Sequence, residues 1–78
     1  MVDYKKTYKN NPEEILKIGL RIRNRRIKLK WTMMELAYES GIDYRQIGRI
    51  ERGETNFTIK TLIRISIALN FGLKDLIK

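Results

Sequence analysis

The sequence contains no cysteine and no histidine, and these two absences exclude several classes of protein. Without cysteine no disulfide bond can form, and without either residue the usual zinc ligands are missing. The carboxylates stand mostly at expected helix caps or on charged faces, so no acid–base constellation for catalysis is visible. We therefore expect a protein that is not an enzyme and has no metal site and no cofactor.

The sequence also has no long apolar run. No stretch approaches the ~20 residues that a membrane-spanning helix needs. Charged residues interrupt any apolar segment near the start, so no secretory signal is visible: Asp3, Lys5, Lys6 and Lys9. We expect a cytoplasmic protein with no membrane partner, and no small-molecule ligand is evident. The 78 residues make one domain, and dimerisation is the remaining way for so short a chain to add a hydrophobic interface.

Positive charge is what the chain has in excess. Seventeen basic residues stand against nine acidic ones, which gives a net charge of +8. Seven of the basic residues, with no acid among them, lie between Lys17 and Lys30. Such a field suits a polyanion, since neutralised phosphates supply most of the affinity for non-specific DNA. A solvated helix face would produce the same charge run, so charge alone leaves both interpretations open.

Two capped amphipathic patterns follow one another in the middle of the chain. Thr32 with Glu35 fits a capping box, and Asp43 with Gln46 repeats the arrangement for a second helix. Gly41 between them can adopt the positive φ that a tight turn needs. Apolar residues fall where both helices turn inward: Leu36, Ile42, Ile47 and Ile50. The pattern is typical of a helix-turn-helix, which presents its second helix to the DNA major groove.

The remaining segments predict an all-α domain without strands. Residues 1–11 are expected to form a basic, flexible arm, and residues 12–78 the helix-turn-helix DNA-binding domain. Asn11 and Pro12 followed by two acids form a strong helix start. We expect five helices, at about residues 12–29, 33–39, 44–52, 59–69 and 74–77. The inner stripe of the first helix is expected to hold Ile15, Ile18, Ile22 and Leu29, widened by Leu20 and Ile27.

Four strings in this order resemble one family: IGLRIRNRR, TMMELAYESG, IDYRQIGRIERG and TIKTLIRISIALN. Over roughly residues 15–76 the chain resembles the lambda-repressor-like, Cro-type (Xre) helix-turn-helix transcriptional regulators. The run RGETNFTIKTL also resembles the small controllers of restriction–modification systems. The resemblance implies a compact five-helix lambda-repressor-like fold. Two positions depart from the family pattern, because Lys30 replaces a glycine that commonly closes the first helix and Met33 replaces a glutamine that commonly opens the second.

Helical spacing divides the third helix into two faces. Ile47 and Ile50 must point into the core, so the opposite face carries Tyr44, Arg45, Gly48, Arg49 and Arg52. Arg45 and Arg49 can reach one groove, where the fork of arginine matches guanine O6 and N7. In the resembled family the first, second and sixth residues of this helix read bases, and here these are Tyr44, Arg45 and Arg49. Either arginine could instead bind only phosphate. Gly48 either avoids a collision with DNA or is merely tolerated.

Other roles follow from helix starts and from the resemblance. Free N–H groups at helix starts mark phosphate sites at Thr32 and Thr58. The family pattern extends this set to six residues: Thr32, Met33, Arg52, Asn56, Thr58 and Lys60, with Met33 acting through its backbone N–H. In the family a late arginine of the first helix pairs with the glutamate of the ERG string, and this brace maps to Arg26 and Glu51. The alternative is that Arg26 faces phosphate directly.

The chain also has more apolar residues near its end than a small monomer needs. We expect a dimer interface formed by Phe57, Phe71, Leu73, Leu76 and Ile77, with packing inside the monomer as the alternative.

The expected function is sequence-specific transcription regulation by a homodimer on double-stranded, pseudo-palindromic operator DNA, with repression favoured over activation. A rival is an antitoxin-like or other protein-interaction module that also binds its own promoter. The two helix caps argue against a membrane-surface or RNA-binding basic helix, since charge alone would not need them.

Overall fold

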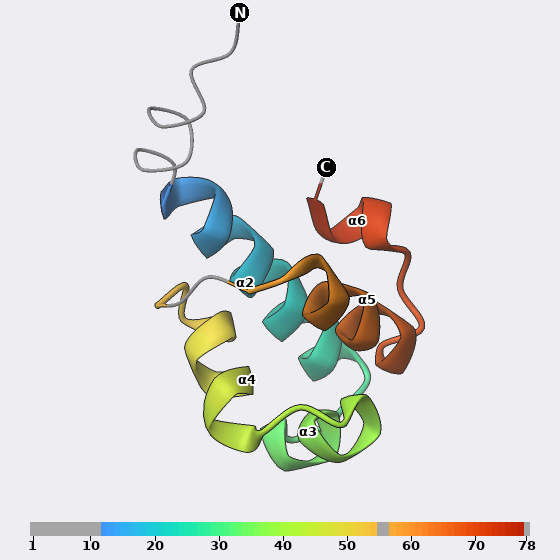
Figure 1. Ribbon diagram of the computed structural model, residues 1–78. Helices are drawn as coiled ribbons and strands as arrows, with labels where there is room; N and C mark the ends of the chain where they lie inside the picture. The colour runs from blue at the N-terminus through green and yellow to red at the C-terminus, as the bar shows by residue number, and fades with distance from the viewer. Residues whose placement is uncertain (1–11, 55–56, 78) are drawn as a thin grey trace, which may run out of the picture.

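The computed structural model describes residues 12–54 and 57–77, which form five helices connected by short turns, with no strand in these two ranges. The helices are α2 (Pro12–Lys28), α3 (Met33–Ser40), α4 (Tyr44–Glu51), α5 (Ile59–Ala68) and α6 (Leu73–Ile77) (Figure 1). The predicted all-α, five-helix fold is thereby confirmed. The expected arm over residues 1–11, including the cap at Asn11, lies outside the described residues. No described helix has the length and apolar character needed to cross a bilayer.

The end of α2 shows how the chain accommodates Lys30 in the place of a glycine. Lys30 adopts the left-handed conformation, with φ of 63°. Its backbone N–H donates to the carbonyl of Ile27 at 2.8 Å, and the N–H of Trp31 donates to the carbonyl of Arg26 at 3.1 Å. These bonds close the helix as a glycine would, although a left-handed residue with a Cβ costs roughly 1–2 kcal/mol. The substitution therefore changes the energy of the helix end and not its geometry.

The two helices of the motif begin at different kinds of cap. At α3 the capping box is present, because the Thr32 hydroxyl accepts from the Glu35 N–H at 3.1 Å and the Glu35 carboxylate accepts from the Thr32 N–H at 2.9 Å. At α4 the predicted cap residue, Asp43, is confirmed, but the predicted box is wrong. The Asp43 carboxylate accepts from the N–H of Arg45 at 2.8 Å, which is the second and not the third helical residue, and the box with Gln46 is not formed. Gly41 closes α3 with φ of 71°.

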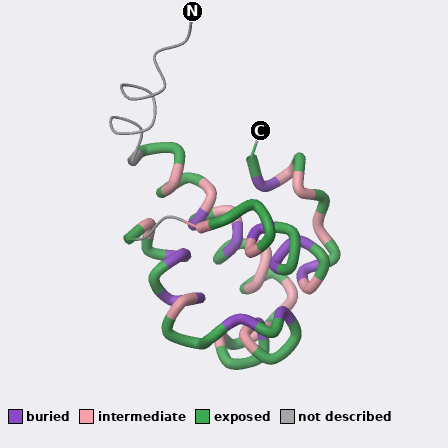
Figure 2. The backbone as a smooth tube through the Cα atoms, viewed as in Figure 1, coloured by how far each residue is buried: buried purple, intermediate pink, exposed green. Residues whose placement is uncertain are grey.

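The core lies where the helices meet, and it contains the four apolar residues that the motif predicted, Leu36, Ile42, Ile47 and Ile50 (Figure 2). The other buried hydrophobic residues are Ile22, Leu62, Ile65, Leu69 and Leu76. Leu20 and Ile27 were expected to widen the inner stripe of α2, but they are 45% and 50% exposed. The exposure of Leu20 follows from the position of Gly19, which contacts α4. Leu20 follows it by one residue, so its side chain points about 100° away from that contact.

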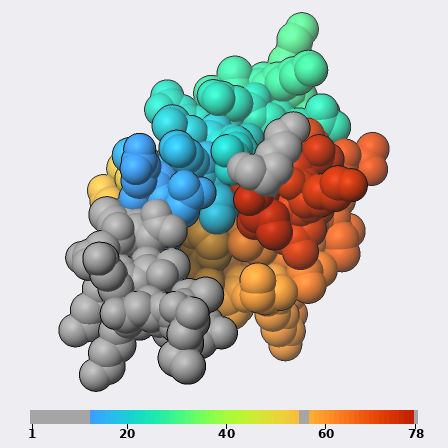
Figure 3. Space-filling model, turned by 90° about the horizontal axis from the view of Figure 1, so that it is seen from above, coloured from blue at the N-terminus to red at the C-terminus, as the bar shows by residue number. Residues whose placement is uncertain are grey.

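Gly19 determines how closely α2 approaches α4. A Cβ at this position would lie 2.8 Å from the backbone carbonyl oxygen of Glu51 and still closer to that of Ile50. The backbones of the two helices are therefore in direct contact. On another side α2 contacts α6, which also packs on α5 (Figure 3). Helix α2 is thus held between α4 and α6.

Candidate nucleic-acid interface

The outer face of α4 is polar and basic, and its inner face is fixed in the core. Ile47 and Ile50 have no exposed surface, whereas Tyr44 is 44% exposed and Arg45 and Arg49 are both exposed. Because the two isoleucines hold the helix by its inner face, they also fix the direction in which the two arginines project. The structure therefore places the three expected base-reading residues together on one accessible surface.

A hollow of about 290 Å³ lies against this face. It is lined by Met33, Tyr44, Arg45, Gly48, Arg49 and Arg52. A second hollow, of about 200 Å³, shares Met33, Gly48 and Arg52 with the first and is completed by Arg23, Arg26 and Glu51. Together they form a surface that carries positive charge from two helices. Gly48 lines both hollows and was expected on the outer face, but it is buried, because the guanidinium of Arg52 lies over it.

The helix starts that were expected to hold phosphate carry their own local hydrogen bonds. The Thr32 hydroxyl accepts from the Glu35 N–H, which leaves its own hydrogen to donate to a ligand. The Thr58 hydroxyl accepts from the N–H of Thr61 at 3.1 Å and lies 3.1 Å from the Thr61 hydroxyl, to which it donates. A phosphate at α5 would therefore contact backbone N–H groups or the exposed Lys60. The expected contact Asn56 lies outside the described residues.

Arg26 and Glu51 form a buried, two-pronged ion pair. Nε and Nη2 of Arg26 donate to Oε2 and Oε1 of Glu51 at 2.7 and 2.9 Å, and Nη1 donates to the carbonyl of Trp31 at 2.8 Å. The side chains of Arg26 and Glu51 are only 12% and 4% exposed. Hydrogen bonding to Glu51 raises the pKa of Arg26 above its ordinary value despite the opposing effect of burial. The guanidinium is thus committed to the protein, which favours the brace over a direct phosphate contact.

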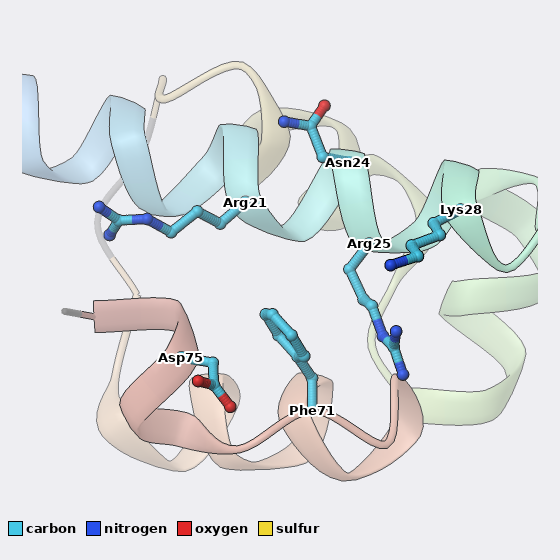
Figure 4. Close-up of a pocket in the computed structure, with 6 residues that line it drawn as sticks. All are labelled: Arg21, Asn24, Arg25, Lys28, Phe71 and Asp75. Carbon is cyan, nitrogen blue, oxygen red and sulfur yellow. The ribbon is translucent and has the colours of Figure 1, made fainter.

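Part of the basic run in α2 faces α5 and α6 and not α4. Arg21 Nη1 donates to the carbonyl of Leu76 at 2.9 Å, and Arg25 donates through Nε to Leu69 and through Nη2 to Asn70 at 3.1 and 3.2 Å. The Arg25 guanidinium also lies 5.1 Å from the centre of the Phe71 ring. Figure 4 shows these side chains around a pocket between α2 and α6.

These bonds change the interpretation of the charge run. Carbonyl groups at the ends of helices carry partial negative charge, and here two arginines of α2 satisfy them. Lys17 lies 3.7 Å from Glu14 in an exposed pair. Arg21 and Arg25 therefore have a role inside the protein, because they hold α2 to the end of α5 and to α6.

Arg23 lies at the candidate interface, although the sequence pattern did not single it out. It is exposed and lines the second hollow with Met33, Gly48 and Arg52. It stands three residues before Arg26, and residues at this spacing share a helix face. Because Arg26 binds Glu51 of α4, the spacing of three residues places Arg23 beside α4 as well.

The structure corrects one residue of the expected dimer interface. Leu76 has no exposed surface, because it is part of the monomer's core and cannot contact a partner. Phe57, Phe71 and Leu73 are half-buried against the same core, and Ile77 is 48% exposed. The larger apolar surface lies on α5 and is formed by Ile59, Ile63 and Ile67, which are 61%, 40% and 73% exposed. These residues are spaced four apart, which was the sequence signal for a continuous stripe on one helix face.

Comparisons with known proteins agree with this fold. The profile of the helix-turn-helix family matches residues 22–76. The chain is similar to the restriction-modification controller protein C.AhdI from Aeromonas hydrophila, with 28% identity and a TM-score of 0.80 over 82% of this chain and 97% of that one. It is also similar to the restriction-modification controller protein C.Esp1396I, with 34% identity and a TM-score of 0.72 over 74% of this chain and 75% of that one.

A third structure shares the fold. The clp gene regulator ClgR from C. glutamicum is 24% identical, with a TM-score of 0.74 over 78% of this chain and 79% of that one. The comparison with curated proteins gave no match.

Proposed function

The chain belongs to the helix-turn-helix family, and from this membership we propose that it is a sequence-specific transcription regulator that reads DNA with α4. One observation carries the proposal. Ile47 and Ile50 hold α4 in the core, so that Tyr44, Arg45 and Arg49 project together from a hollowed, basic surface. A helix presented in this way fits the major groove of B-DNA.

The proposed base contacts come from the exposed face of α4. Arg45 and Arg49 each donate two hydrogen bonds to a guanine, which is the commonest specific base contact. Tyr44, at the start of the helix, contacts a thymine methyl group or a phosphate. Gly48 leaves room for the guanidinium of Arg52, which lies over it beside these side chains.

The proposed phosphate contacts surround this face. They are made by Thr32, by the backbone N–H of Met33, by Thr58 and Lys60, and by Asn56 and Arg52. We add Arg23, because it is exposed beside Met33 on the same surface. Contacts of this kind fix the position of the protein on the duplex but carry no sequence information.

The proposed assembly is a homodimer on a pseudo-palindromic operator, since one recognition helix reads too few base pairs for specificity in a genome. The exposed stripe of Ile59, Ile63 and Ile67 is the surface that a second copy would cover. Two points support this choice. The three side chains form one apolar line on α5, and the line begins next to Thr58, a proposed phosphate contact. A partner on this stripe would therefore lie close to the same duplex.

The proposed role is repression, in which the dimer occupies its operator and blocks RNA polymerase. The similarity to C.AhdI and C.Esp1396I supports a narrower proposal, that the chain controls the genes of a restriction–modification system. An inverted repeat in the DNA just upstream of the protein's own gene would supply the operator and indicate autoregulation.

In vitro selection from random-sequence duplexes tests the proposal. We expect an enriched pseudo-palindrome whose half-sites lie one DNA turn, ~34 Å, apart. Analytical ultracentrifugation of the complex should then show two protomers per duplex. Ile63→Lys should abolish this stoichiometry, whereas Ile27→Lys, at an exposed isoleucine of α2, should not. Selection without enrichment would contradict sequence-specific binding, and a single protomer bound with full affinity would contradict the dimer.

A further inference from the structure

Glu54 is an acidic residue at a surface that otherwise suits DNA. The nearby acids have local roles, because Asp43 caps α4 and Glu51 is buried against Arg26. Glu54 is different, since its side chain is 54% exposed and it stands three residues after Glu51, the last residue of α4. An exposed carboxylate so close to the proposed phosphate contacts should repel DNA unless it has another partner.

That partner is Arg52. Its Nε donates to Oε2 of Glu54 at 2.8 Å and its Nη2 donates to Oε1 at 3.2 Å. The hydrogen bond to Glu54 raises the pKa of Arg52 above its ordinary value, and the same bond lowers the pKa of Glu54 below its own. The carboxylate therefore stays ionised throughout the neutral range.

Gly48 allows this arrangement to lie flat on the recognition helix. A Cβ on Gly48 would come within 3.0 Å of Nη1 of Arg52, which shows that the guanidinium lies over this glycine. Arg52 lines both hollows of the interface from this position. The fork of an arginine binds phosphate and carboxylate in the same two-pronged geometry. The Glu54 carboxylate thus occupies the guanidinium of Arg52, which is the group that would bind a DNA phosphate.

We propose that Glu54 is an internal competitor for DNA phosphate, which holds Arg52 in the free protein and limits its affinity for DNA. This inference rests on the proposed function. Both side chains are more than half exposed, and an ion pair of that kind is weak. A DNA phosphate can therefore displace the Glu54 carboxylate from Arg52 without any rearrangement of the helices. Because breaking the ion pair costs free energy, the contact between Arg52 and the phosphate then adds less to the free energy of DNA binding. The acid at this surface reduces the grip of Arg52 on DNA of any sequence.

The test compares Glu54→Gln with Glu39→Gln on a random-sequence duplex. The control, Glu39→Gln, removes the same charge from an exposed residue in the last turn of α3. Thr32, a proposed phosphate contact, lies at the opposite end of that helix. We expect Glu54→Gln to tighten binding on the order of three- to fivefold for each bound protomer, beyond the effect of the control. It should also steepen the dependence of log K on log salt by about 0.9 for each phosphate that Arg52 gains.

The double variant Arg52→Gln with Glu54→Gln shows whether the gain passes through Arg52. We expect the double variant to bind tighter than Arg52→Gln alone by no more than the effect of the Glu39→Gln control. A Glu54→Gln protein that behaves like the Glu39→Gln control, or a gain that persists without Arg52, would overturn the inference. Failure of the proposed function would look different, because selection would then enrich no operator even if Glu54→Gln still tightened binding to random DNA. Binding to no duplex at all would overturn both.

Discussion

Arg26 donates two hydrogen bonds to Glu51, at 2.7 and 2.9 Å, and this pair joins the first helix to the recognition helix. The guanidinium also binds the carbonyl of Trp31, at the turn before α3. One side chain of α2 therefore contacts both ends of the segment that forms the helix-turn-helix. The pair holds α4 against α2 and lines the second hollow beside Gly48 and Arg52, while Arg45 and Arg49 of the same helix stay exposed.

Glu51→Ala should destabilise the protein because it leaves the buried guanidinium of Arg26 unpaired. We expect the free energy of unfolding to fall by about 3 kcal/mol in urea titrations, since breaking a buried pair at one partner is costly. Glu54→Ala is the matched control, because it breaks an exposed pair and should leave the urea midpoint unchanged. Equal effects of the two variants would mean that burial does not strengthen the Arg26 pair.

Two glycines should respond to alanine in opposite ways. Gly19→Ala would push a Cβ into the backbone of Glu51, which cannot move without separating α2 from α4. We expect a loss of about 1–3 kcal/mol in unfolding free energy. Gly48→Ala meets only the flexible end of Arg52, so the better helix propensity of alanine should raise stability by up to ~1 kcal/mol. Thermal melts of both variants test these two expectations. A Gly19→Ala protein more stable than the unchanged protein would contradict the close contact between α2 and α4.

Lys30→Gly should stabilise the fold. Lys30 has φ of 63°, which is strained for a residue with a Cβ and natural for glycine. Removal of that strain should raise the unfolding free energy by about 1 kcal/mol. Gly41→Ala, at φ of 71°, is the converse change and should lower it by a similar amount. If Lys30→Gly instead lowers the melting temperature, the end of α2 is not left-handed in solution.

Arg21 and Arg23 should differ in their effect on the salt dependence of DNA binding. Arg23 lines the interface, whereas Arg21 binds a carbonyl of α6 on another side of α2. Arg23→Gln should therefore lower the slope of log K against log salt by ~1 for each bound protomer. Arg21→Gln should leave the slope unchanged and lower only the melting temperature. An equal loss of slope in both variants would place both side chains on phosphate.

The parts of the fold that depend on residues close together in the sequence could be predicted from it. The Thr32 capping box, the turn at Gly41 and the inward faces of α3 and α4 are local features, and the structure contains all of them. The cap of α4 was only half predicted, because Asp43 reaches Arg45 and not Gln46. Spacing shows that a carboxylate can cap a helix, but the backbone angles at the cap decide which N–H it reaches.

The features that depend on contacts between helices could not be predicted. Leu76 looks like a surface residue of a short terminal helix until α6 is placed against α2 and α5, where it becomes core. Arg21 and Arg25 look like DNA contacts until the ends of α5 and α6 approach them. Gly19 likewise has no distinguishing sequence signal, because the need for a glycine comes from the backbone of α4.

The central claim is that α4 reads bases while the start of α5 binds the phosphate backbone. The most direct measurement is the affinity of Arg45→Ala, Arg49→Ala and Lys60→Ala for the selected operator and for a random duplex of equal length. Each arginine variant should lose ~1–3 kcal/mol on the operator and little on random DNA, whereas Lys60→Ala should weaken both duplexes about equally. Equal weakening of both duplexes by Arg45→Ala and Arg49→Ala would contradict the account, because the exposed face of α4 would then not be the surface that reads DNA sequence.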